Sequence, residues 1–270
     1  GVTKSVYPSV LQYAHVKNNC IEDVRVGIQT GNFWQANPGG SNFQLIENNT
    51  IQARRRGIFH NLFYSSASPF TVRDNAITGL NNSNETLWDG ILVSSQANAV
   101  QILKDNNIDG TGISTQATIG INVWNDQVAP EIDGGNISNV KLGINVNNFE
   151  GYNSNAGNTV AVIKNVTVTT TTIAGIKVHD NPSNTNGATV NANIGTGNTI
   201  SNSPIGIWIV GSDATATITH NNFTSNTTDI QSDVTAGSVV ANYNNLSGSS
   251  YGINNLSSNT IGRASCRERV

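Results

Sequence analysis

A short apolar phrase, glycine followed by isoleucine, returns at regular intervals along most of the chain. The isoleucine is present in all nine copies, and in one copy aspartate replaces the glycine. The copies are Gly27-Ile28, Gly57-Ile58, Gly90-Ile91, Gly120-Ile121, Gly143-Ile144, Gly175-Ile176, Gly206-Ile207, Asp229-Ile230 and Gly252-Ile253. Self-similarity at a period of this length indicates a repeat architecture.

A second apolar position precedes each Gly-Ile phrase, and its copies are 23 to 32 residues apart. Its nine members are Ile21, Ile51, Ile77, Ile108, Ile137, Val168, Ile200, Phe223 and Leu246. We expect a short β-strand around each of these apolar positions. Short strands gain stability only by stacking, so that each pairs in parallel with its copies on both sides, at about 4.8 Å per repeat. We therefore expect an all-β fold, a single-stranded right-handed parallel β-helix of about nine coils. Its isoleucines should face inward, and its glycines should serve a turn with positive φ or a close backbone approach.

Asparagine occupies a third position of the repeat, two residues before the second apolar file. The members are Asn19, Asn49, Asn75, Asn106, Gly135, Val166, Asn198, Asn221 and Asn244. Asparagine tolerates left-handed backbone, and its amide can hydrogen-bond to the same amide in the next repeat. We expect a structural asparagine ladder.

Other repeat architectures fit the pattern less well. Leucine is scarce, which disfavours a leucine-rich repeat, and a propeller needs longer antiparallel strands. The bias toward β-branched residues, asparagine and glycine disfavours helices.

The phrases Ile218-Thr219-His220-Asn221-Asn222-Phe223 and Gly206-Ile207-Trp208-Ile209 resemble repeats of the pectate-lyase-like superfamily. The likeness is strongest to its Asn-, Thr- and Gly-rich secreted bacterial members and covers about residues 9–261. It implies a right-handed parallel β-helix. Because that superfamily includes polysaccharide lyases, hydrolases, adhesins and phage tailspikes, the resemblance implies no single activity.

Composition limits the class of partner. The 270 residues carry a net charge of −3 and only 11% charged side chains, so no basic surface for nucleic acid is expected. No run of about 18 apolar residues predicts a membrane span. The two cysteines, Cys20 and Cys266, do not make a disulfide framework.

We expect one β-helix domain over residues 1–262, with its coils clearest from 9 to 261. Residues 263–270 differ from the rest, with three arginines among eight residues. They form a basic tail that resembles vector- or adapter-derived ends of metagenomic reading frames. The chain starts at Gly1 and shows no signal peptide, so we expect it to be part of a longer protein.

Charge is concentrated in one file on six consecutive repeats: Lys17, Glu47, Arg73, Lys104, Asp133 and Lys164. A lyase that acts on acidic polysaccharide must neutralise a carboxylate with cations and remove a proton with a base. The catalytic hypothesis therefore assigns Arg73, Lys104 and Glu47. In the next file Asp74 and Asp105 stand on adjacent repeats, where a calcium ion would offset their repulsion. The structural interpretation is that alternating signs relieve repulsion between stacked charges.

Five further residues are candidates for ligand binding. Phe59 and Trp208 follow the Gly-Ile phrase directly and are expected to be outward platforms for a sugar ring. Trp88 and Asp89 lie in a long insertion of the third repeat, and Arg55 lies in a basic cluster. The four histidines are expected to be ordinary strand or turn residues; they are His15, His60, His179 and His220.

The leading functional hypothesis is a non-catalytic extracellular module of a larger bacterial secreted or surface protein, which serves adhesion or carbohydrate binding. A polysaccharide or cell-surface glycan is the expected partner. The alternative is a calcium-assisted lyase or a glycoside hydrolase of acidic polysaccharide. Scarce charge and the absence of a dense acidic or basic cleft favour the first hypothesis.

Overall fold

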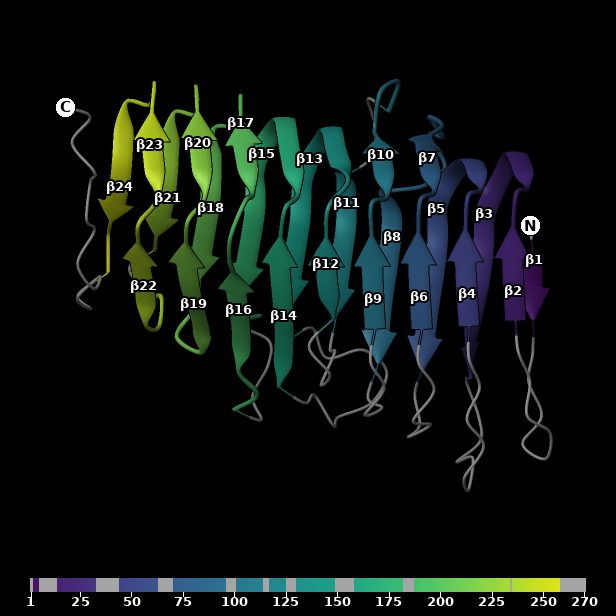
Figure 1. Cartoon of the computed structure of the whole chain (residues 1–270), viewed down its shortest axis with the longest axis horizontal. Helices are drawn as coiled ribbons and strands as arrows, with labels where there is room; N and C mark the ends of the chain where they lie inside the picture. Colours follow the sequence, from purple (N-terminus) through teal and green to yellow (C-terminus); the bar gives the residue numbers. More distant parts are fainter. Residues whose placement is uncertain are drawn as a thin grey trace.

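The computed structural model describes residues 2–4, 14–32, 44–62, 70–95, 101–113, 117–124, 130–148, 158–181, 187–233 and 235–257. Every regular element in these ranges is a β-strand. Every strand pairing that they contain is parallel. Figure 1 shows the strands side by side along the long axis, in sequence order from β1 to β24. The prediction of an all-β chain with parallel strands is confirmed.

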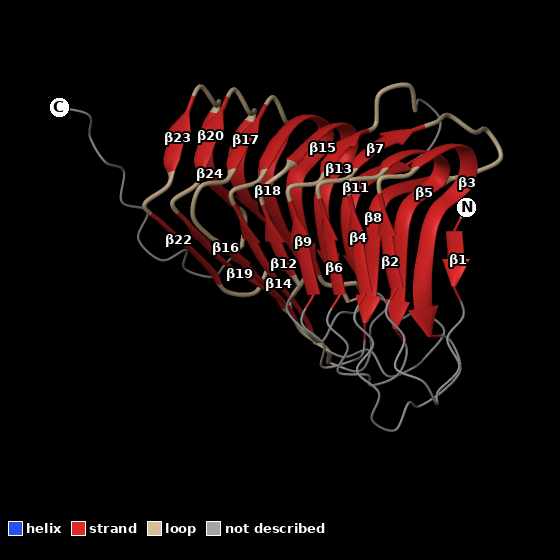
Figure 2. Ribbon diagram, turned by 45° about the vertical axis from the view of Figure 1, so that its right-hand side comes forward, coloured by secondary structure: helices blue, strands red, loops and turns tan. Residues whose placement is uncertain are grey.

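The strands form two sheets, which the chain enters in turn. The nine-stranded sheet holds one strand from each repeat: β2 (Ala14–Lys17), β4 (Gln44–Glu47), β6 (Phe70–Arg73), β9 (Gln101–Lys104), β12 (Glu131–Asp133), β14 (Thr159–Lys164), β16 (Val190–Ile194), β19 (Ala214–Thr219) and β22 (Val239–Asn242). The fifteen-stranded sheet holds β1 (Val2–Lys4), β3 (Cys20–Asn32), β5 (Thr50–Leu62), β7 (Ala76–Gly79), β8 (Leu87–Ser95), β10 (Asn107–Asp109), β11 (Ala117–Trp124), β13 (Asn136–Asn147), β15 (Thr167–His179), β17 (Thr199–Ser201), β18 (Ile205–Val210), β20 (Asn222–Thr224), β21 (Thr228–Ser232), β23 (Asn245–Ser247) and β24 (Tyr251–Asn255). Figure 2 shows the short turns, in tan, that join these strands.

Both apolar files predicted from the sequence are confirmed by the pairing register. The file that precedes the Gly-Ile phrases runs without a break from Ile21 to Leu246, each member paired with its copy in the next repeat. The isoleucine file of the Gly-Ile phrases runs in the same way from Ile28 to Ile253. From Ile28 to Ile230, members of this isoleucine file are at most 3% exposed, so it is part of the hydrophobic core.

The glycine that precedes a core isoleucine is needed because the next repeat approaches it closely, and not because its φ is positive. A Cβ built on Gly90 would lie 2.5 Å from Cγ2 of Ile108 and 2.6 Å from the carbonyl oxygen of Gly120. The equivalent contacts recur at Gly57 and at Gly120 itself. Each of these glycines therefore lies against the next repeat's member of the file that begins at Ile21 and against its glycine backbone, which leaves no room for a side chain there.

The left-handed backbone lies one residue before the position at which we expected it. The asparagines of the ladder do not have left-handed backbone. The residue that precedes each of them does, because it turns the chain from one sheet into the other. The members of this left-handed file have φ between 50° and 85°: Asn18, Asn48, Asp74, Asp105, Gly134, Asn165, Gly197, His220 and Tyr243. Seven are asparagine, aspartate or glycine, the residues that tolerate this conformation best.

The asparagine ladder itself is confirmed. The Asn49 amide Nδ2 donates to Oδ1 of Asn75 at 3.0 Å, and Nδ2 of Asn75 donates to Oδ1 of Asn106 at 2.9 Å. The same Asn75 oxygen accepts the backbone N–H of Asn49 at 3.0 Å. Equivalent contacts join Asn198 to Asn221 and Asn221 to Asn244. The ladder satisfies polar groups in a buried corner, where leaving them unpaired would be costly.

The stack is not uniform, because the third and fourth repeats carry insertions. Strands β5 and β13 run through a corner as single strands of 13 and 12 residues. The two repeats between them are each split there, into β7 and β8 and into β10 and β11. Since β5 and β13 each pair with both halves, six strands close into a ring of pairings. Trp88 is fully buried at this break and donates its indole N–H to the carbonyl of Ala53 at 3.0 Å.

We expect Gly90→Ala to destabilise the fold by about 1–3 kcal/mol, because the added methyl has no space and the neighbouring backbone must move. Gly195→Ala is the matched control, since its Cβ would approach nothing closer than 3.8 Å. Urea unfolding of both variants measures the difference. Equal midpoints for the two variants would show that the glycine file does not depend on close packing.

His60 is a buried base within the core. Its side chain is 0% exposed, its Nδ1 lies 2.8 Å from Oγ1 of Thr30, and its ring stacks on Phe70 at 3.6 Å. Within the described residues its Nε2 has no hydrogen-bond partner. Burial lowers the pKa of His60 from 6.5 to about 3, because the imidazolium form would lose its hydration.

The unfolded chain therefore binds a proton below about pH 6.5 that the folded chain binds only near pH 3. The contribution of neutral His60 is fully present above the unfolded pKa and is lost as the pH falls toward the folded pKa. Between pH 7 and about pH 4 the loss should be about 3 kcal/mol. Urea unfolding of the wild type and of His60→Leu at both pH values tests this. The variant should lose less stability on acidification, and equal losses would contradict the assignment.

Candidate functional site

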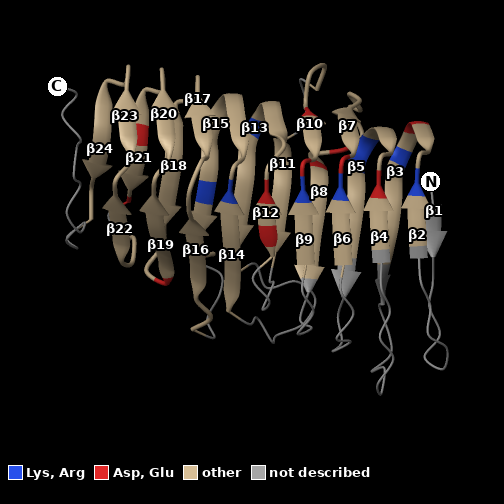
Figure 3. Ribbon diagram, viewed as in Figure 1, with Lys and Arg blue, Asp and Glu red and all other residues tan. Residues whose placement is uncertain are grey.

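The predicted file of charged residues is a continuous array on the nine-stranded sheet. The register aligns its members in order as Lys17, Glu47, Arg73, Lys104, Asp133 and Lys164. Figure 3 shows these blue and red ends in one row across β2 to β14. The sequence therefore placed these six side chains next to one another correctly.

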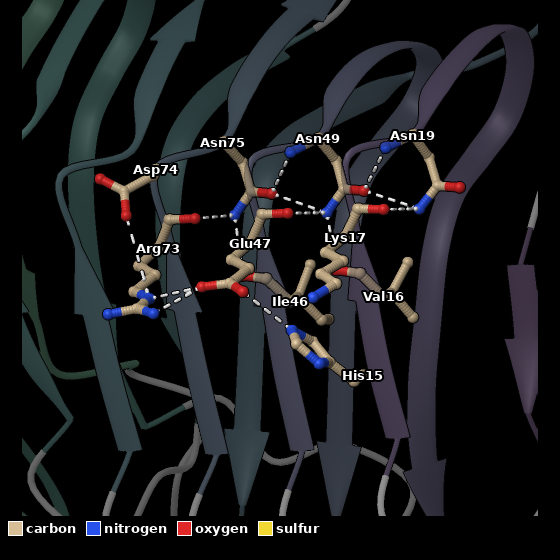
Figure 4. A network of polar contacts seen from close by, with 10 residues as sticks. All are labelled: His15, Val16, Lys17, Asn19, Ile46, Glu47, Asn49, Arg73, Asp74 and Asn75. Carbon is tan, nitrogen blue, oxygen red and sulfur yellow. Dashed lines mark hydrogen bonds and ion pairs between the residues drawn. The ribbon is translucent and has the colours of Figure 1, made fainter.

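Glu47 is the centre of the array, and Figure 4 shows both of its oxygens engaged. Oε2 accepts hydrogen bonds from Nε and Nη2 of Arg73 at 2.8 and 2.6 Å, and Oε1 lies 2.9 Å from Nε2 of His15. Donation by Arg73, followed by His15, lowers the pKa of Glu47. A carboxylate with reduced proton affinity and two occupied oxygens is a poor proton acceptor, which weighs against its predicted role as a base.

The cations of the array are directed at its own carboxylates. Arg73 holds Glu47, and its Nε lies 3.9 Å from Oδ2 of Asp74. Two repeats beyond Lys104, Nζ of Lys164 lies 2.8 Å from Oε1 of Glu131 and 3.6 Å from Oδ2 of Asp133. These pairs match the structural interpretation, in which opposite charges stack on one another, while Arg73 and Lys104 are adjacent like charges. Lys104 is exposed opposite Arg73, and the catalytic roles of both residues remain a hypothesis.

Asp74 and Asp105 belong to the left-handed turn file, with φ of 56° and 50°. Their residue type is explained by this backbone, which aspartate tolerates. Among the described residues there is no group of three or more His, Cys, Asp or Glu side chains that could hold a metal. The guanidinium of Arg73, with its Nε 3.9 Å from Oδ2 of Asp74, disfavours a second cation at this carboxylate. The calcium site stays a prediction.

Three of the predicted ligand-binding residues are buried. Trp88 and Asp89 are 0% exposed and Phe59 is 7% exposed. Trp88 and Asp89 stand at the start of β8 and not on a projecting loop, and the guanidinium of Arg56 lies 4.4 Å from the centre of the Phe59 ring. The expectation that Phe59 is an exposed platform was wrong, because Arg56 covers its ring. Trp88 and Asp89, predicted as ligand-binding residues of an insertion, are enclosed instead.

Asp89 belongs to a polar network on the outer side of the fifteen-stranded sheet. Its Oδ2 lies 3.3 Å from Nε of Arg56, and its Oδ1 accepts from Nδ2 of Asn122 at 3.1 Å. Burial raises the pKa of Asp89, and Arg56 opposes that rise. At the edge of this network Arg55 is 34% exposed and lies 3.5 Å from Glu85. The basic cluster is thus balanced by carboxylates of neighbouring repeats.

Trp208 is on the outer side of β18, as predicted, but its ring already contacts Lys177 and Asp233. Nζ of Lys177 lies 4.6 Å from the ring centre, and the indole N–H donates to Oδ1 of Asp233 at 3.1 Å. Burial lowers the pKa of Lys177. A sugar could stack on the Lys177 side of this ring only by displacing the lysine.

Sequence reasoning missed a hollow at the turn between the two sheets, in the seventh to ninth repeats. There the left-handed file reads Gly197, His220 and Tyr243. His220 and Tyr243 are stacked with ring centres 5.2 Å apart and an interplanar angle of 21°, and Tyr243 is 66% exposed. Gly197 contributes no side chain to the file, so it leaves an open step beside the His220 ring. The hollow is lined by Gly197, Asn198, Thr199, His220, Asn221, Asn222, Tyr243 and Asn245.

The base of this hollow is rigid, and its rim is polar. Asn198 and Asn221 are ladder residues held by buried hydrogen bonds. Nδ2 of Asn245 donates to Oδ1 of Asn222 at 2.6 Å, which pairs two amides of adjacent repeats on the rim. An aromatic wall beside fixed amides is an arrangement that can hold a ring with hydroxyl groups. The sequence did contain a signal for this hollow. The left-handed file consists of Asn, Asp and Gly except at two positions, where it has His220 and Tyr243.

Comparison with known proteins adds no relative: no family model, no curated protein and no solved structure matches the chain. The described residues contain no helix with the length and apolar character needed to cross a membrane.

Substituting Arg73 by glutamine should raise the pKa of Glu47 toward its ordinary value, because the largest cause of its lowering is removed. A carbon-13 NMR titration of the Glu47 side-chain carboxyl measures this. Lys104→Gln is the control, since it removes a neighbouring cation in the same file and should change the Glu47 pKa much less. A Glu47 pKa that does not respond to Arg73→Gln would contradict the observed pairing.

Proposed function

We propose that this chain is an extracellular module that binds carbohydrate without transforming it, and that the hollow beside His220 is its binding site. The observation that carries the proposal is the placement of an aromatic pair in the left-handed turn file. Tyr243 has a φ of 56°, a conformation in which a bulky side chain is an outlier. Strain of this kind is concentrated at functional sites, where a binding role offsets it.

The aromatic pair offers the chemistry that sugar recognition uses. The C–H face of a pyranose is apolar and packs on an aromatic ring, while its hydroxyls need fixed polar partners. His220 supplies such a ring, Tyr243 supports it from the next repeat, and the Asn222–Asn245 pair supplies amides nearby. The ladder beneath holds these groups in place before a ligand arrives, which lowers the entropic cost of binding.

The scaffold is, in this proposal, a right-handed parallel β-helix of about nine coils, of the kind seen in the pectate-lyase-like superfamily. The continuous pairing of each repeat with the next supports this architecture. Placement outside the cell is supported by the Asn-, Thr- and Gly-rich repeats and by the secreted proteins that they resemble. A lyase centred on Arg73, Lys104 and Glu47 is supported less well, because Glu47 is already held by Arg73 and His15.

Tyr243→Asn separates a binding role from a structural one. Asparagine is the commonest residue of this file, so the variant should be more stable by about 1 kcal/mol while glycan binding falls at least about tenfold. His220→Asn should lose binding with little change in stability. Isothermal titration calorimetry with glycans that a screen identifies, together with urea unfolding, measures both effects.

Asp105→Asn is the matched control, because it changes the same file five repeats away from Tyr243 and should leave binding intact. Retained binding in both aromatic variants would refute the assignment of the hollow. Ultraviolet detection of unsaturated products from alginate or pectate, lost in Lys104→Ala, would establish the lyase instead.

A further inference from the structure

We infer that the ligand unit held in this hollow is an uncharged pyranose with two neighbouring free hydroxyl groups, seated over Gly197 against the ring of His220. The inference deepens the proposed function and depends on it. It selects neutral glycans and excludes the acidic polysaccharides that the charged file on β2 to β14 suggests.

The position of the sugar follows from the left-handed file. Its members lie one above another, and Gly197, whose N–H donates to the carbonyl of His220 at 3.0 Å, has no side chain to cover the His220 ring. One face of that ring is covered by Tyr243, at 5.2 Å between ring centres. The other face looks toward the Gly197 step, where a pyranose would be the third member of the stack. On the far side of Gly197, a Cβ would meet Oδ1 of Asn165 at 2.5 Å, so that amide oxygen bounds the step.

The rim amides match a pair of adjacent hydroxyls. Asn245 uses Nδ2 to donate to Oδ1 of Asn222. Because each amide has both donor and acceptor atoms, the pair still presents the Asn222 N–H groups and the Asn245 oxygen. One sugar hydroxyl can accept from Asn222 while its neighbour donates to Asn245. Thr199, in the repeat before, adds a hydroxyl to the same rim.

The absence of ionic partners in the hollow decides the charge of the ligand. None of its lining residues is Asp, Glu, Lys or Arg. A uronate placed there would give up carboxylate hydration with no cation to compensate, which is costly. Among the described residues the nearest cation of the charged file is Lys164 in the sixth repeat, and its Nζ is held by Glu131 at 2.8 Å and by Asp133 at 3.6 Å. Arg73 and Lys104 belong to the third and fourth repeats, far along the stack.

The test is titration calorimetry of the folded chain with neutral gluco-, manno- and galacto-oligosaccharides and with oligogalacturonate, at low and high salt. We expect binding of at least one neutral series, with an affinity that changes less than about twofold between the two salt concentrations. Asn222→Asp, which replaces the donors on the rim by acceptors, should weaken that binding at least about tenfold.

Gly197→Asn fills the step and should abolish binding. Its backbone φ of +85° is one that asparagine accepts, and the atom its Cβ meets is the end of the Asn165 side chain, which can move. Gly134→Asn is the matched control: it changes the same file, meets the end of the Asp105 side chain in the same way, and lies outside the hollow. Asn222→Asp keeps the inference testable if Gly197→Asn does not fold.

The two proposals fail in different ways. Binding of oligogalacturonate alone, with steep salt dependence and loss in Arg73→Ala, would overturn the neutral-ligand inference and leave carbohydrate binding in place. Neutral binding that survives both Gly197→Asn and Asn222→Asp would overturn the assigned position. No binding of any glycan would overturn the proposed function itself.

Discussion

Close parallel stacking of identical positions is the constraint on which the rest of this structure depends. Two apolar files, one from Ile21 to Leu246 and one from Ile28 to Ile253, pair with their own copies across every repeat. From Gly27 to Gly206 the repeats approach so closely that a Cβ at the glycine position would not fit. Because each repeat buries its apolar side only against its neighbours, stability is spread along the stack and the outer side chains are left to form files of their own.

Because the outer side chains form files, polar side chains interact mainly along the stack. The asparagine ladder satisfies one corner, the charged file pairs both of its carboxylates with its own cations on one sheet, and the left-handed file forms the turn between the sheets. In each of them a residue meets mainly the same position of the adjacent repeats. The proposed site is a departure from its file. Tyr243 is such a departure in a turn built from Asn, Asp and Gly, and the step at Gly197 is what gives His220 an open face.

The insertions of the third and fourth repeats show the other way in which regularity is broken. They split the strands between β5 and β13, close a ring of six pairings and admit Trp88 to the core. The same region holds the Arg56–Asp89 pair and the half-exposed arginine cluster. Here the departure serves packing, because the aromatic ring is enclosed and the charges are matched. Breaks in a repeat thus carry function only where they leave groups accessible.

The sequence by itself determined the parallel all-β stack, both apolar files, the asparagine ladder and the order of the charged file. Similar residues that recur every 23 to 32 positions pack on one another when the repeats stack in register, so this recurrence was sufficient. Tertiary structure alone decided that Glu47 is held by Arg73 and His15, that Phe59 and Trp88 are buried, and that the left-handed residue precedes each ladder asparagine. Those outcomes depend on where side chains of unequal repeats meet in space. A period counted along the chain does not contain that information.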